Sequence, residues 1–135
     1  FDLVSLLIGV NNEFQGKSVE SFESEFKTCL DFAINRCSNG KKGVFVLSIP
    51  DYGYTPYGKR RQADISKRID AFNAVCKNTC DELGITYFDI TPISRKGLDN
   101  KELVANDGLH PSGLQYKLWV ESCQAAVVKQ LEHLN

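Results

Sequence analysis

The stretch VFVLSIP at residues 44–50 decides the fold. It is an apolar run interrupted by Ser48 and ended by Pro50. A run that is apolar at consecutive positions is typical of a strand buried on both faces, as in parallel sheets covered by helices. Similar runs, LVSLLI at residues 3–8 and ITYFDI at residues 85–90, precede and follow it. The three runs therefore predict three strands of one parallel sheet.

Between these runs the apolar residues recur with the 3.6-residue period of an α-helix. Residues 18–37 and 62–83 each present one apolar stripe, and residues 112–134 form a last helical segment. Ser18 is placed to cap the first of these helices, and Gly84 ends the second. Strands that alternate with helices predict an α/β domain with right-handed crossovers and helices on the faces of its sheet.

Composition excludes several functional classes. The 135 residues are 42% hydrophobic and carry a net charge of -1, so nothing favours binding to nucleic acid or to an anionic membrane surface. No apolar run approaches the ~20 residues of a membrane span. The odd number of cysteines and their helical settings indicate buried free thiols rather than a disulfide framework. Free thiols favour the cytoplasm, although the sequence leaves the location unknown.

The loop after the third strand contains DGLHP, with Asp107 and His110 three residues apart. A histidine that acts as a base through Nε2 needs a carboxylate on Nδ1, and this spacing allows both side chains to face the same way. The alternative is that Asp107 caps a turn and His110 is an ordinary surface residue.

The other two loops at the carboxyl end of the sheet also carry polar or aromatic residues. Gly9 directly follows the first strand, and Asn11 and Asn12 come next. An asparagine amide there can donate to a developing oxyanion, or it can simply stabilise a turn. The second loop, PDYGYTPYG, contains Tyr52 and Tyr54, which either wall a pocket for an acyl chain or sugar or only pack the loop.

Four stretches together resemble one family. LLIGVNNEFQG, VFVLSIPDYGYTP, YFDITPISR and DGLHPSGLQYKLW are similar to a bacterial branch of the SGNH (GDSL-type) hydrolases, in the family's order. The resemblance runs through essentially all of residues 1–135. It implies a three-layer αβα sandwich with a flavodoxin-like parallel sheet. This chain would be the C-terminal portion of a single such domain, without its first strands.

The resemblance also implies roles for individual residues. His110 would be the general base of a serine esterase, Asp107 its orienting carboxylate, and Asn11 an oxyanion-hole donor, with Gly9 allowing close backbone approach. The family usually continues Gly-x-Asn-Asp, whereas this sequence has Asn12 at the fourth position. Asn12 is therefore kept only as a substrate-pocket candidate, together with Tyr52 and Tyr54. The resemblance implies no metal and no cofactor.

The family's nucleophile lies in a Gly-Asp-Ser motif, which does not occur among these 135 residues. We therefore expect a carboxylic ester hydrolase, esterase- or lipase-like or a carbohydrate deacetylase, that acts on a small-molecule ester. Its serine would lie upstream, and this chain alone would be inactive. The alternative is a non-catalytic acyl- or sugar-binding or interaction module left by truncation. In either case, the edge strand from Asp2 to Gly9 would lack its neighbouring strand and would self-associate or retain an N-terminal fragment.

Overall fold

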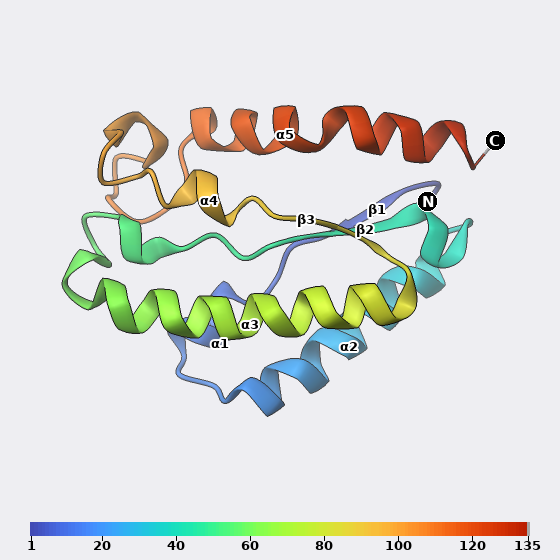
Figure 1. Cartoon of the computed structure of the whole chain (residues 1–135), viewed down its shortest axis with the longest axis horizontal. Coiled ribbons are helices and arrows are strands. Elements are labelled where there is room, and N and C mark those ends of the chain that lie inside the picture. The colour runs from blue at the N-terminus through green and yellow to red at the C-terminus, as the bar shows by residue number, and fades with distance from the viewer. Residues whose placement is uncertain (135) are drawn as a thin grey trace.

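Three short parallel strands form the centre of the computed structural model, which describes residues 1–134 (Figure 1). They are β1 (Val4–Leu6), β2 (Val44–Leu47) and β3 (Thr86–Phe88), in the spatial order β1-β2-β3. All three lie where the apolar runs predict them, but each is shorter than its run.

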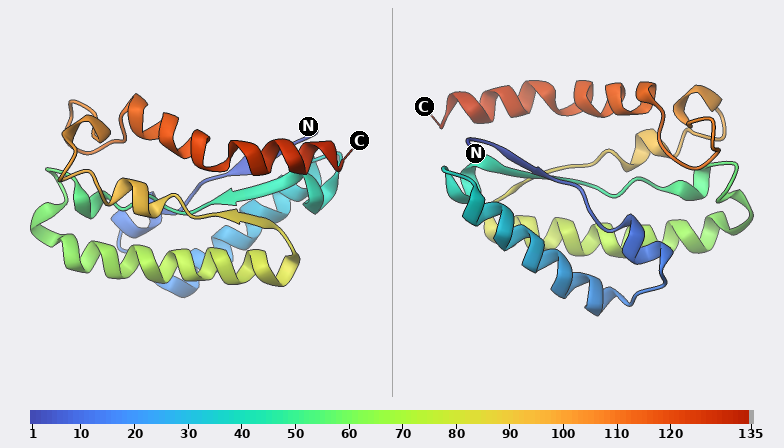
Figure 2. Two further views of the ribbon diagram at one scale, coloured as in Figure 1. Left: turned by 45° about the horizontal axis from the view of Figure 1, so that its top comes forward. Right: turned by 180° about the vertical axis from the view of Figure 1, so that it is seen from behind.

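Helices cover both faces of the sheet, as the alternating pattern predicts. α2 (Val19–Arg36) and α3 (Gln62–Leu83) lie on one face, and α5 (Gly113–Glu132) lies on the other (Figures 1 and 2). The Ser18 side chain accepts a hydrogen bond from the Ser21 backbone N–H at 3.2 Å, and Gly84 ends α3 in the left-handed conformation. The α/β fold with a parallel sheet, expected from the resemblance, is confirmed.

The main core lies between the sheet and the α2–α3 layer. Phe22 and Phe72 stack there with their ring centroids 4.4 Å apart, and both rings are fully buried. Burying a side chain of this size contributes roughly 1.5–3 kcal/mol. Cys76 and Cys80 belong to the same core, where burial raises the pKa of both thiols and keeps them unreactive. The expectation that the cysteines are buried is wrong for Cys29, which faces solvent on α2.

Two short helices occupy segments that the sequence pattern assigns to loops. α1 (Val10–Phe14) follows β1, and α4 (Thr91–Ser94) follows β3. Each has about one turn, too short for a 3.6-residue period to be recognised. Both lie at the carboxyl end of the sheet, so they help to build the site rather than the core.

The face of the sheet under α5 and the outer edge of β1 are less completely covered than the face under α2 and α3. Trp119 and Cys123 on α5 are buried, whereas Tyr116 and Val120 remain 52% and 57% exposed. Within residues 1–134, β1 pairs only with β2, so its outer edge is free (Figure 2). None of the helices in the described part of the chain combines the length and apolarity needed to cross a bilayer.

Candidate active site

Asp107 and His110 form a direct side-chain contact in the turn before α5. The Asp107 Oδ2 atom lies 2.6 Å from His110 Nδ1, and Oδ1 accepts the backbone N–H groups of Leu109 and His110 at 2.9 and 3.0 Å. These bonds, led by those from the two backbone amides, lower the pKa of Asp107 to about 2. The carboxylate therefore stays ionised at neutral pH and can only accept a hydrogen bond, so in a neutral imidazole it favours the tautomer with the proton on Nδ1 and the lone pair on Nε2.

The backbone of this turn is fixed on both sides. The Ala105 N–H donates to the His110 carbonyl at 2.8 Å, and Gly108 takes a φ of +74°, which favours glycine. The Tyr57 N–H donates to the Gly108 carbonyl at 3.0 Å, which ties the turn to the tyrosine-containing loop. The Asp–His pair is thus held in place although both side chains are largely exposed.

Helix α1 directs three consecutive side chains to three different surroundings. Asn11 is exposed, and its side chain makes no hydrogen bond with residues 1–134. The Asn12 amide instead donates to Glu25 on α2 at 2.7 Å, and Glu13 turns inward to Arg68 on α3. Successive helical residues differ by about 100° in direction, so this divergence follows from the helix itself.

A cleft of about 460 Å³ lies at the carboxyl end of the sheet, in the size range of ligand pockets. Asn11, His110 and Tyr52 all line it. Most of the other lining side chains are apolar: Leu7, Ile8, Val10, Phe14, Ile49, Pro50, Leu109, Pro111, Tyr116 and Trp119. The cleft is therefore an apolar space with an imidazole and an amide on its wall.

The remaining predicted site residues lie outside the cleft lining. Asp107 stands behind His110, and Tyr54 is half-buried in its own loop. Asn12 was predicted as a pocket residue, but it is not among the residues that line the cleft, and its amide donates to Glu25 on α2. Gly9 lies beneath the cleft with a φ of +121°, where a Cβ atom would come within 2.4 Å of Ile49 Cδ1.

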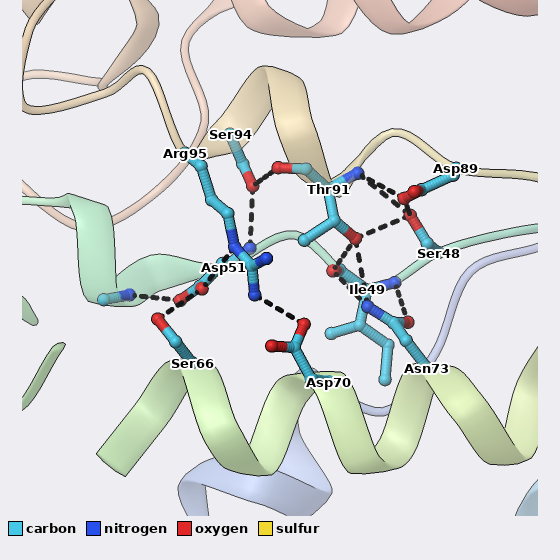
Figure 3. Close-up of polar contacts among 11 residues, drawn as sticks. Ser48, Ile49, Asp51, Ser66, Asp70, Asn73, Asp89, Thr91, Ser94 and Arg95 are labelled. Carbon is cyan, nitrogen blue, oxygen red and sulfur yellow. Dashed lines mark hydrogen bonds and ion pairs between the residues drawn. The ribbon is translucent and has the colours of Figure 1, made fainter. Parts of the chain in front are cut away.

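The loop after β2 is anchored by a buried carboxylate that the sequence pattern does not reveal (Figure 3). Asp51 is 1% exposed, yet its Oδ2 atom accepts from Arg95 Nε at 3.0 Å and from Ser66 Oγ at 2.6 Å. Its Oδ1 atom accepts from the Gly53 N–H at 2.9 Å. Because Asp51 also lines the cleft, this cluster fixes the wall that carries Tyr52.

A second group of contacts joins the ends of β2 and β3 (Figure 3). The Asn73 side chain accepts from the Ile49 N–H at 2.7 Å and donates to its carbonyl at 3.2 Å. The Ser48 hydroxyl donates to Asp89 at 2.9 Å and accepts from Thr91 Oγ1 at 2.7 Å. These side chains take over the hydrogen bonds of the strands where regular pairing stops, so the loops of the site start from fixed positions.

Ser94 is the only serine among the cleft-lining residues, all of which lie in the described part of the chain. It is 4% exposed, and its hydroxyl donates to the Thr91 carbonyl at 2.6 Å. The same oxygen accepts the Asp51 N–H at 2.8 Å. With its proton and a lone pair both engaged in backbone contacts, Ser94 has a structural role.

The fold is a parallel sheet covered by helices on both faces, and the cleft at its carboxyl end carries an imidazole in contact with a carboxylate. The chain belongs to the GDSL-like lipase/acylhydrolase family, whose model matches residues 2–118. It is also 30% identical over 128 residues to a protein from Ruminococcus flavefaciens described as a multidomain esterase. That alignment covers 91% of this chain but 16% of the relative, so the chain spans a small part of its length. Both matches support esterase-like hydrolysis as the activity of the family.

Proposed function

We propose that this chain supplies the acid–base half of a serine ester hydrolase. Asp107 holds the imidazole, His110 is the general base, and the Asn11 amide with the backbone near Gly9 stabilises the oxyanion. One observation carries the proposal: His110, bound to Asp107 at 2.6 Å, lines the same cleft as Asn11, whose side-chain amide has no hydrogen-bond partner among residues 1–134. The nucleophilic serine is proposed to come from outside residues 1–135, since Ser94 is structurally engaged.

The proposed reaction is acyl transfer in two steps. The serine oxygen attacks the ester carbonyl carbon while His110 Nε2 takes its proton, and the carbonyl oxygen becomes an oxyanion near the Asn11 amide. The tetrahedral intermediate then expels the alcohol, which receives the proton from His110. Water repeats the sequence on the acyl-enzyme and releases the carboxylic acid. Asp107 stabilises the imidazolium formed in each step.

The cleft supports a small ester as the substrate class. Its volume of about 460 Å³ and its largely apolar lining favour an acyl group of modest size. The Tyr52 ring stands near Phe14, with their centroids 5.8 Å apart, and both form part of the same wall. We propose that this wall contacts the acyl or alcohol part of the ester.

The test uses a polypeptide that extends this chain upstream to include the serine. His110→Ala should lower the rate of p-nitrophenyl ester hydrolysis by about 10³-fold or more, because triad members act as a unit. The matched control is His133→Ala, since His133 binds the Lys129 carbonyl near the end of α5. His133→Ala should retain full activity.

A fluorophosphonate probe separates the esterase from the non-catalytic alternative. Covalent labelling of the extended polypeptide supports an enzyme, whereas binding of an ester without labelling or turnover supports a binding module. Equal activity in the His110→Ala and His133→Ala variants would refute the role of His110.

A further inference from the structure

Glu13 is a buried carboxylate on α1 that the proposed mechanism does not use. Its side chain is 3% exposed, and Arg68 Nε of α3 lies 3.0 Å from its Oε1 atom. Arg68 Nη2 also donates to the Lys17 carbonyl at 2.9 Å, just after α1. One guanidinium therefore holds α1 through Glu13 and the following segment through its backbone.

This ion pair is incompletely satisfied. The Glu13 Oε2 atom is buried and has no hydrogen-bond partner among residues 1–134, although the Tyr52 side chain lies close by. A buried carboxylate oxygen without a hydrogen-bond partner lowers the stability of the fold. An apolar side chain at position 13, packed against α3, would often give the same or greater stability. The Glu13 carboxylate therefore contributes to the orientation of α1 rather than to stability, because its ion pair with Arg68 fixes the helix relative to α3.

The direction of α1 matters because it carries Asn11. The helix has five residues, too few to hold its orientation by its own hydrogen bonds. Glu13, two positions after Asn11, is the one buried residue of α1. A shift of α1 at Glu13 would consequently move the Asn11 amide relative to His110.

We infer that Glu13, held by Arg68, is a positioning residue for the Asn11 amide. This inference rests on the proposed function, since it assumes that Asn11 stabilises the oxyanion. Glu13 does not itself line the cleft, although the neighbouring Tyr52 does, so its effect on Asn11 is transmitted through the orientation of α1.

The experiment compares Glu13→Gln with Glu25→Gln in the serine-containing polypeptide. Each substitution removes one carboxylate charge that contacts α1 or its flank, but Glu25 is exposed and binds Asn12 and Lys17. Titration with a fluorophosphonate gives the concentration of active sites, to which kcat is normalised. Glu13→Gln should lower kcat about tenfold and leave KM unchanged. This loss is part of the ~10²–10³-fold rate effect that one oxyanion donor supplies. Glu25→Gln should match the unmodified protein.

A double-mutant cycle with Asn11→Ala distinguishes positioning from general stability. If Glu13 acts through Asn11, Glu13→Gln should lower kcat much less in the Asn11→Ala background than alone. An equal loss in both backgrounds, or an unchanged kcat in the single variant, would overturn the inference. Arg68→Lys provides a second variant with the charge retained, and it should also lower kcat without changing KM. Retained activity in Asn11→Ala or His110→Ala would instead refute the proposed function.

Discussion

At the residue scale, the contact between Asp107 and His110 determines which imidazole nitrogen is free to act. The sequence spacing predicts that the two side chains face each other, and the 2.6 Å contact confirms it. The backbone N–H groups of Leu109 and His110 could not be inferred from spacing, yet they are the main cause of the low pKa of Asp107. The same turn therefore orients the carboxylate and keeps it ionised.

Side-chain carboxyl titration by ¹³C NMR tests this arrangement. The Asp107 carboxyl should titrate with a midpoint near 2 rather than at the ordinary value of 3.8. Because the folded-state pKa is lowered, the associated stabilisation is fully present above about pH 4 and is lost as the pH falls toward 2.

The control for this titration is the His110→Ala variant. It removes the imidazole contact but keeps the backbone amides, which contribute most to the shift, so the midpoint should rise only part of the way toward 3.8. A midpoint at or above 3.8 in the unmodified chain would show that the amides do not hold the carboxylate.

At the element scale, long periodic segments were predictable and one-turn helices were not. Residues 62–83 are predicted as a helix and observed as α3, because an apolar stripe and a glycine at its end mark the segment. α1 has no such stripe, so sequence reasoning placed Asn11 and Asn12 together in a loop. Its helical geometry separates them, and only Asn11 lines the cleft.

Gly9 joins β1 to α1, and its substitution tests how tightly this junction is packed. Gly9→Ala should lower the free energy of unfolding by about 2–5 kcal/mol, from steric overlap with Ile49 and Phe22 and from a strained φ of +121°. Gly84→Ala is the control, since its φ is also positive but nothing lies within 4 Å of the added Cβ atom.

The measurement is urea unfolding followed by circular dichroism. Gly84→Ala should lower the free energy of unfolding by about 1–2 kcal/mol, the strain of a left-handed residue alone. Equal losses in the two variants would show that the contacts around Gly9 do not restrict this position.

At the scale of the whole molecule, the sequence predicted the layers and the edge of the sheet that carries the site. Family resemblance, rather than periodicity, singled out Asn11 and His110 from other polar loop residues. The Asp51–Arg95 contact joins two of the loops across 44 positions in the chain, and no local pattern signals a pairing at that separation. Phe14 and Trp119 were not predicted to line the cleft, because their positions depend on how distant elements pack.

The free edge of β1 supports a prediction about association. Its unpaired backbone groups lie near exposed apolar side chains, including Leu7, so we expect the 135-residue chain alone to self-associate. Size-exclusion chromatography with light scattering measures this association. Ser5→Lys, which places a charge on β1, should weaken self-association, and a monodisperse, stable monomer of 15.1 kDa would argue against the prediction.

Whether Asn11 and His110 act on the same bound ester is tested by a crystal structure of the serine-containing polypeptide after reaction with a phosphonate ester. We expect a covalent serine adduct in the cleft, with the phosphoryl oxygen about 3 Å from the Asn11 side-chain nitrogen. His110 Nε2 should lie at a similar distance from the serine oxygen. An adduct whose phosphoryl oxygen faces away from Asn11, or a reactive serine remote from His110, would contradict the account.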